Sequence, residues 1–169
     1  MKPVIAITGG TGFLGRHVIQ HFLNQGAKLK LLVRQPENVD WGMPQEQAEK
    51  LDIIKGSLSD KEALTRLVDG ADVVVHMAGL IKARRQIDFE KSNIDGTRNL
   101  IDVLNAQNPD AGFVFVSSMA AREPSFSLYS SSKAAAEKVV LEQIDQPVIL
   151  RPCAIYGPCL LYTSDAADE

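Results

Sequence analysis

The stretch SLYSSSKAAAEK, residues 127–138, places a tyrosine and a lysine four positions apart at the start of a helical pattern. This spacing puts Tyr129 and Lys133 on one face of a helix, within reach of each other or of a shared group. A phenol titrates near pH 10, and lowering that value by about three units requires roughly 4 kcal/mol. One lysine charge at about 4 Å supplies that amount at an effective dielectric near 20. The pair suits proton transfer, and an ordinary surface pair is the alternative.

A glycine-rich stretch, AITGGTGFLG at residues 6–15, lies between an apolar run and a helical pattern. Gly9, Gly12 and Gly15 satisfy G-x-x-G-x-x-G, and Gly10 with Gly12 and Gly15 satisfies G-x-G-x-x-G. Such glycines allow a tight turn, bare backbone beside a pyrophosphate, and close packing of helix on strand. A plain tight turn would use the same residues. Because the stretch joins the first expected strand to the first expected helix, we predict a dinucleotide site.

The elements that must position these residues alternate along the chain. Apolar runs typical of strands occur at 3–8, 28–34, 51–56, 72–79, 112–118 and 147–152, and helical patterns occur at 13–26, 61–70, 89–107 and 128–143. Strands that are apolar on both faces and joined by helices indicate a parallel sheet covered on both sides. The sequence therefore predicts an α/β, doubly wound parallel sheet of the Rossmann type. Its first helix should end near Gly26, which supplies a left-handed residue.

The end of the second strand, LLVRQPEN at 31–38, bears on which dinucleotide is bound. An acidic residue about twenty positions after the glycines would accept the ribose 2′-hydroxyl of NAD. Here Val33 and Arg34 occupy that place, and a guanidinium suits a 2′-phosphate. NADP is therefore favoured over NAD. The alternative is that Arg34 is solvated and Glu37 reaches back to the ribose.

Composition restricts the partners. With a net charge of -3 and basic residues scattered among acidic ones, the chain is expected to bind a small molecule rather than nucleic acid or a membrane. MKPVIAITGG has no stretch typical of a signal peptide or membrane span, so we expect a cytoplasmic protein. His17 and His21 lie one helical turn apart without a third ligand, so no metal site is predicted.

A later strand, GFVFVSS at 112–118, ends in Ser117 and Ser118. Ligands bind beyond the carboxyl ends of parallel strands, so Ser118, Tyr129 and Lys133 are expected to converge. At this point the chain resembles the extended short-chain dehydrogenase/reductase superfamily, in its NAD(P)-dependent epimerase/dehydratase group, from Met1 to Pro158. The resemblance rests on six motifs in one order: TGGTGFLG, HMAGL, NIDGT, VSSMA, YSSSK and RPCAIYGP.

The resemblance implies roles for these residues. Tyr129 would be the general acid/base, Lys133 would hold the nicotinamide ribose and make the phenol more acidic, and Ser118 would polarise the substrate oxygen. His76 is expected to be packed rather than catalytic, and Asn93 either supports the site by hydrogen bonds or packs its helix. The residues implied to contact the cofactor are Gly9, Gly12, Phe13, Leu14, Gly15, Arg34, Ser57, Leu58, Met77, Ala78, Gly79, Ser117, Lys133, Pro152 and Ile155.

Two departures from the family pattern affect the substrate. Ser57 stands where relatives often place an aspartate that bonds the adenine amine. The segment between Ser118 and Tyr129 is shorter than the loop usual in sugar-nucleotide epimerases. The expected reaction is thus hydride transfer at a carbinol or carbonyl carbon of a sugar nucleotide or other hydroxy or keto compound. A non-catalytic NAD(P)-binding sensor or accessory subunit is the rival, and intact Ser118, Tyr129 and Lys133 argue against it.

Domain boundaries follow from the same pattern. Residues 1–158 are expected to form one NAD(P)-binding Rossmann domain, interrupted before the family's substrate domain. CLLYTSDAADE, residues 159–169, resembles a translated sequencing adapter and is expected to be a non-native tail. A short natural tail is the alternative. For the full-length protein the resemblance leaves a homodimer open.

Overall fold

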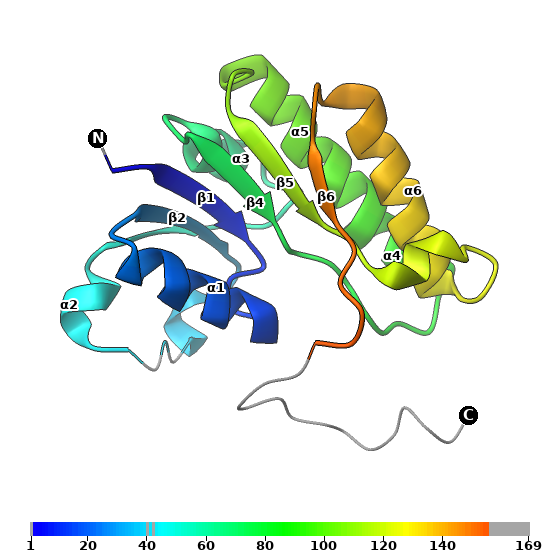
Figure 1. Cartoon of the computed structure of the whole chain (residues 1–169), viewed down its shortest axis with the longest axis horizontal. Helices are drawn as coiled ribbons and strands as arrows, with labels where there is room; N and C mark the ends of the chain where they lie inside the picture. Colours follow the sequence, from blue (N-terminus) through cyan, green and yellow to red (C-terminus); the bar gives the residue numbers. More distant parts are fainter. Residues whose placement is uncertain (1, 40, 42, 156–169) are drawn as a thin grey trace.

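The computed structural model describes residues 2–39, 41 and 43–155. All strands are parallel and form one six-stranded sheet in the order β3-β2-β1-β4-β5-β6 (Figure 1). The strands are β1 Val4–Thr8, β2 Lys28–Val33, β3 Leu51–Lys55, β4 Val73–His76, β5 Gly112–Val116 and β6 Val148–Leu150. The direction in which strands are added reverses between β1 and β4, which creates a crevice at their carboxyl ends. The predicted doubly wound Rossmann sheet is confirmed.

Helices cover the sheet from both sides. They are α1 Phe13–Asn24, α2 Gln45–Ala48, α3 Lys61–Val68, α4 Gln86–Phe89, α5 Gly96–Gln107 and α6 Leu128–Gln143. Helices α3, α5 and α6 pack on one face, whereas α1 packs on the other face with α2 beside it (Figure 1). None of the helices in the described residues is both long enough and apolar enough to cross a bilayer.

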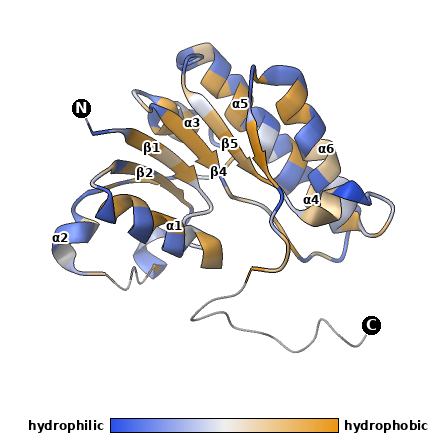
Figure 2. Ribbon diagram, in the orientation of Figure 1, coloured by the Kyte–Doolittle hydropathy of each residue, from blue (hydrophilic) through white to orange (hydrophobic). Residues whose placement is uncertain are grey.

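The core consists of two layers because successive strand residues face opposite sides. In β1, Ala6 belongs to the layer under α3, α5 and α6, while Ile5 and Ile7 belong to the layer under α1. Strands β1, β4 and β5 are largely apolar along their length, and the helices carry both hydrophilic and hydrophobic residues (Figure 2). Burial of both sheet faces explains why the strands lack polar alternation.

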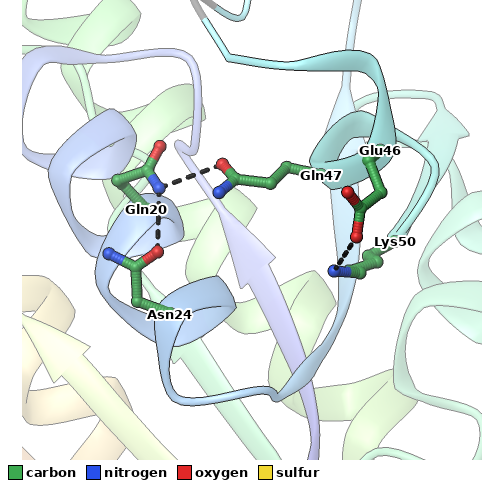
Figure 3. A network of polar contacts seen from close by, with 5 residues as sticks. All are labelled: Gln20, Asn24, Glu46, Gln47 and Lys50. Carbon is green, nitrogen blue, oxygen red and sulfur yellow. Dashed lines mark hydrogen bonds and ion pairs between the residues drawn. The ribbon is translucent and has the colours of Figure 1, made fainter.

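The α1 layer is closed at its outer edge by polar contacts. Helix α1 ends at Asn24, and Gly26 follows with φ of +78°, as its sequence position predicts. Gln20 Nε2 donates to Oε1 of Gln47 at 3.0 Å and to Oδ1 of Asn24 at 3.1 Å, which ties α2 to α1 (Figure 3). Side-chain amides therefore help to hold α2 against α1.

A wide apolar groove, here called the β4–β5 groove, lies beside α1 on the same face of the sheet. Its cavity volume is about 730 Å³. The floor is formed by Val73 and Val75 of β4 with Val114 and Val116 of β5. The walls are Leu14, Val18 and Phe22 on α1, with Leu150, Pro152 and Ile155 on the other side. In the described residues, the α1 layer thus covers β1 and β2 more completely than β4 and β5.

The expected helix at 89–107 differs from the structure in one respect. Residues Glu90–Asp95 form a π-helical segment between α4 and α5. The amide of Gly96 donates to the carbonyl oxygen of Lys91, five residues earlier, instead of four. Segments of this kind widen the helix and are frequent at functional sites. This segment contains Asn93, which is buried.

Candidate active site

The glycine loop between β1 and α1 is shaped by close approach of backbone to backbone. Gly9 has φ of +77°, and a Cβ at this position would lie 2.5 Å from the amide nitrogen of Ala78. A Cβ at Gly15 would lie 2.3 Å from the carbonyl oxygen of Gly9. Gly12 begins α1 without a side-chain cap, so the first amides of the helix are available to an anion. The loop fits the pyrophosphate of a dinucleotide.

Phe13 and Leu14, also expected at the cofactor, occupy the first turn of α1. The ring of Phe13 packs edge-on against His17 with centroids 5.1 Å apart. Leu14 is half-buried and lines the β4–β5 groove. Their side chains belong to the helix surface beside the glycine loop, and their role at a cofactor stays a prediction.

A second cavity, of about 410 Å³, lies where β2 ends beside the glycine loop. Its lining residues are Thr11, Arg16, Val33, Arg34, Gln35, Asn38 and Val39. Two guanidinium side chains therefore line one cavity at the place where the ribose of the adenosine half is expected. Sequence reasoning named Arg34 and missed Arg16, which enters from the first turn of α1. The signal for Arg16 was its position four residues after Gly12, one turn into the helix.

Glu37, the alternative ribose ligand, has another partner. Its carboxylate lies 3.4 Å from Nζ of Lys55, and it is not among the residues that line the cavity. A backbone hydrogen bond is the main cause that lowers the pKa of Glu37, with Lys55 contributing. This arrangement places the carboxylate with β3 rather than with the cavity.

The residues after β3 are held by neighbouring side chains. The Ser57 hydroxyl hydrogen-bonds that of Ser59 at 2.9 Å. Asn99 on α5 donates to the carbonyl oxygen of Leu58 at 3.0 Å, and Leu58 packs closely against Gly96. This turn is rigidly placed beside α5, and its contact with an adenine stays a prediction.

The loop after β4 borders the glycine loop. The amide of Met77 donates to the carbonyl oxygen of Thr8 at 3.1 Å, and the amide of Ala78 donates to the Thr8 hydroxyl at 3.2 Å. A Cβ at Gly79 would lie 3.7 Å from Nζ of Lys133. The structure thus brings the expected cofactor-lining loop next to the expected catalytic lysine.

Lys133 is only 4% exposed, although it carries an ammonium group. Its Nζ donates to the carbonyl oxygen of Val116 at 2.9 Å and lies 4.5 Å from the centroid of the Phe115 ring. Burial lowers the pKa of Lys133 to about 8, and the charge of Glu137 acts in the opposite direction. A charged group at such depth is uncommon unless it is paired or functional.

Glu137 lies one turn further along α6 and forms a bidentate pair with Arg151. The two hydrogen bonds, from Arg151 Nε and Nη2, measure 2.9 and 2.7 Å. Burial is the largest single influence and would raise the pKa of Glu137, but the hydrogen bonds from Arg151, the nearby Ser117 hydroxyl and the charges of Arg151 and Lys133 together lower it. The pair fixes α6 against the segment that follows β6.

Ser118 and Tyr129 lie on either side of a short connection. The Ser118 hydroxyl accepts a hydrogen bond from the amide of Ala120 at 3.2 Å and caps the 3₁₀ helix Met119–Arg122. Tyr129 is half-buried in the first turn of α6, with its ring 6.4 Å from that of Phe89. Among the described residues, no hydrogen bond joins the side chains of Ser118, Tyr129 and Lys133 to one another. The three belong to the end of β5 and the start of α6.

Ser117, the last of the expected cofactor contacts near β5, is 4% exposed. Its hydroxyl makes no hydrogen bond in the described part of the chain. The Ser117 hydroxyl lies close enough to the Glu137 carboxylate to help lower its pKa, but the two groups are not aligned as a hydrogen bond. Pro152 accepts from the amide of Met119 at 3.0 Å, and Pro152 and Ile155 line the β4–β5 groove. The last three residues of the RPCAIYGP motif, 156–158, and the expected tail, 159–169, lie outside the described residues.

Comparison with known proteins settles the family. The family model described as NAD dependent epimerase/dehydratase family matches residues 5–167. The chain belongs to this family. The expected membership of the NAD(P)-dependent epimerase/dehydratase group is confirmed.

Two relatives with named activities match this chain in sequence. A ceramide reductase of Caulobacter vibrioides is 43% identical over 158 residues, which are 93% of this chain and 48% of that protein. A decarboxylating sterol-4-alpha-carboxylate 3-dehydrogenase of Dictyostelium discoideum is 32% identical over 117 residues, 68% of this chain and 34% of that one. The chain spans about half the length of the ceramide reductase and about a third of the length of the sterol dehydrogenase.

Solved structures share the fold. The enzyme WbmG of Bordetella bronchiseptica, in complex with NAD, superposes with a TM-score of 0.74 at 23% identity, covering 89% of this chain and 53% of that one. A short-chain dehydrogenase/reductase superfamily protein of Agrobacterium tumefaciens with bound NAD gives a TM-score of 0.72 at 24% identity, covering 88% and 48%. At this level of identity the likeness concerns the fold.

Proposed function

We propose that the full-length protein is an NADP-dependent oxidoreductase or epimerase that acts on a carbinol or carbonyl carbon of an apolar small molecule. The observation that carries the proposal is the buried ammonium of Lys133, which lies at the end of β5 and one helical turn from Tyr129. Burying an ammonium is unfavourable even with Glu137 nearby, so a functional role accounts for it better than packing does.

The side chains of this chain would then divide the work. Tyr129 exchanges the proton with the substrate oxygen, and Ser118 donates a hydrogen bond to that oxygen. Lys133 holds its positive charge on the same helix face as the phenol and favours the phenolate. A bound nicotinamide supplies or accepts the hydride. The Ser118 hydroxyl now caps a 3₁₀ turn as an acceptor, so its proton stays available to a substrate oxygen.

The choice of NADP rests on charge around the cavity at the end of β2. Arg16 and Arg34 both line it, and Glu37 is engaged with Lys55 instead. A 2′-phosphate carries negative charge and several acceptor oxygens, which suits forked guanidinium donors. An NAD-specific site would instead present a carboxylate to the ribose hydroxyls.

The preference for an apolar substrate has two supports. Phe126 is 85% exposed and, with Leu128, comes just before Tyr129, while Ile81 is 77% exposed in the loop after β4. Large exposed apolar side chains beside a site favour apolar ligands. Relatives of the chain are named for ceramide and sterol substrates. A long-chain or polycyclic hydroxy or keto compound is therefore the proposed substrate class.

The rival is a non-catalytic accessory subunit. A relative in Dictyostelium discoideum that is 26% identical over 155 residues is named as a mitochondrial NADH dehydrogenase subunit. The Tyr129→Phe variant separates the two, tested on the full-length protein with long-chain ketones, ketosteroids and NADPH. We expect turnover to fall by about 10²–10⁴-fold with cofactor affinity unchanged. Ser131→Ala, an exposed change on the same helix, is the control, and full turnover in Tyr129→Phe would refute the catalytic role.

A further inference from the structure

Polar side chains cross the interior of the domain between the sheet and α5. His76, at the end of β4, is fully buried, as are Thr8 and Thr97 on either side of its ring. The Nδ1 atom of His76 lies 2.6 Å from the hydroxyl of Thr8, and its Nε2 atom lies 2.9 Å from the hydroxyl of Thr97. Both ring nitrogens are therefore hydrogen-bonded inside an apolar core.

The partners fix the direction of each hydrogen bond. Thr97 donates its single hydroxyl proton to the carbonyl oxygen of Asn93 at 2.6 Å, so it accepts from Nε2–H of His76. The Nδ1 atom then accepts from the hydroxyl of Thr8, which itself accepts from the amide of Ala78. Burial, with the charge of Lys133, lowers the pKa of His76 to about 3, which agrees with a neutral ring.

Asn93 extends this chain toward the catalytic helix. Its Oδ1 accepts from the amide of Leu80 at 2.6 Å, and its Nδ2 donates to the carbonyl oxygen of Leu80 at 2.9 Å. The same Nδ2 donates to the Ser132 hydroxyl at 2.9 Å, and Ser132 donates to the carbonyl oxygen of Tyr129 at 2.8 Å. The π-helical segment Glu90–Asp95 carries Asn93 at the point where these groups meet.

The loop and the helix joined in this way enclose Lys133. A Cβ at Gly79 would lie 3.4 Å from Oδ1 of Asn93 and 3.7 Å from Nζ of Lys133. A movement of the loop after β4 relative to α6 would therefore change the surroundings of the ammonium. Both polar atoms of the Asn93 side chain are hydrogen-bonded, which ties the loop after β4 to α6.

We propose that Thr8, His76, Asn93, Thr97 and Ser132 form a positioning hub that fixes the loop after β4 against the turn of α6 carrying Tyr129 and Lys133. The inference rests on the proposed function in that the hub sets the geometry between the nicotinamide end of the cofactor and the phenol. None of the hub residues needs to touch substrate. Thr97, buried on α5, is the member through which the hub is best tested.

The test compares Thr97→Val with Thr97→Ser in the full-length protein. Valine has the shape of threonine without the hydroxyl, and serine keeps the hydroxyl. Two readouts are used: NADPH affinity with the fluorescence of the bound nicotinamide, and the rate of hydride transfer to a long-chain ketone. We expect Thr97→Val to keep NADPH affinity but to alter the nicotinamide fluorescence and slow transfer by up to about 10²-fold, as small misplacements do. Thr97→Ser should resemble the parent protein.

The outcomes separate the hub from the proposed function. If Tyr129→Phe keeps full turnover while Thr97→Val alters the nicotinamide fluorescence, the catalytic assignment fails and the hub stands. If Thr97→Val only lowers the melting temperature and leaves both readouts at parent values, the hub is refuted. Should Thr97→Val not fold, Ser132→Ala is judged by the same two readouts, since it removes the last link to Tyr129.

Discussion

The ammonium of Lys133 on α6 donates a 2.9 Å hydrogen bond to the carbonyl oxygen of Val116, the last residue of β5. An ammonium has three N–H donors, and within the described residues this is its one hydrogen bond. The strand end therefore anchors the cation while leaving donors for a ligand. The arrangement explains how a buried charge is tolerated.

Glu137 should control the charge of Lys133. Burial lowers the pKa of Lys133 to about 8, and the negative charge of Glu137 counteracts part of that effect. Glu137→Gln removes the charge but keeps hydrogen-bonding atoms, so the pKa of Lys133 should fall further. NMR titration of the lysine Cε resonance would measure it, with the exposed Glu142→Gln as control. An unchanged Lys133 titration in Glu137→Gln would contradict this electrostatic account.

His76 should make the protein less stable in acid. Its pKa is about 3 in the folded protein because of burial, against 6.5 ordinarily, so between these values the unfolded chain binds a proton that the native protein does not. The free energy of unfolding should therefore fall as pH falls from 7 to 5, by about 2 kcal/mol from this residue.

The measurement is urea unfolding at both pH values. In His76→Asn the free energy of unfolding should be lower at pH 7 and should change less between pH 7 and pH 5. His17→Asn, an exposed histidine on α1, is the control and should keep the parent dependence. A parent-like pH dependence in His76→Asn would rule out His76 as its source.

Alanine substitutions at two glycines of the same loop should have different effects, one on stability and the other on NADP affinity. A Cβ at Gly15 would lie 2.3 Å from a backbone oxygen, so Gly15→Ala should lower the melting temperature. At Gly12 the nearest atom would be 3.4 Å away, so Gly12→Ala should fold normally. Its methyl would nevertheless occupy the approach of the pyrophosphate, and NADP affinity should drop about tenfold or more. Parent-like NADP affinity in a folded Gly12→Ala would argue against binding at this loop.

The β4–β5 groove should make the 169-residue chain self-associate. Its floor of valines and its volume of about 730 Å³ form a continuous apolar surface, and such surfaces associate in water. We expect size-exclusion chromatography to show species larger than a monomer and a hydrophobic dye to bind. Val114→Lys, on the groove floor, should reduce both effects. A monomeric parent chain that melts cooperatively would show the expectation to be wrong.

The local pattern of apolar residues was sufficient to predict the parallel sheet and its main helices. Apolar runs on both faces predicted parallel strands, and the pattern at 128–143 predicted α6 with the same bounds as the structure. The end of α1 just before Gly26 was equally predictable, since a glycine commonly supplies the left-handed residue that follows a helix. These features depend on neighbours in sequence.

Features that depend on distant neighbours could not be predicted. The π-helical segment around Asn93 gave no local signal, and the partners of the Asn93 side chain, Leu80 and Ser132, lie 13 and 39 residues away in the sequence. His76 was expected to be packed, and it is, but its link to Thr97 required knowledge of how α5 lies on the sheet. The position of Arg16 one turn after Gly12 was visible in the sequence, but its cavity depends on how α1 lies against the end of β2.

Binding of NADP by the glycine loop and the cavity at the end of β2 is the central expectation for this protein. Titration calorimetry with NADP and NAD side by side, on the parent protein, Arg34→Ala and Arg16→Ala, tests it, with the exposed Arg66→Ala as control and a melting curve on each sample. We predict that NADP binds about tenfold or more tighter than NAD, because a charged hydrogen bond contributes about 1.5–3 kcal/mol. Each cavity variant should lose most of that preference. Equal binding of NADP and NAD by a folded parent protein, or a preference that survives Arg34→Ala, would contradict the account.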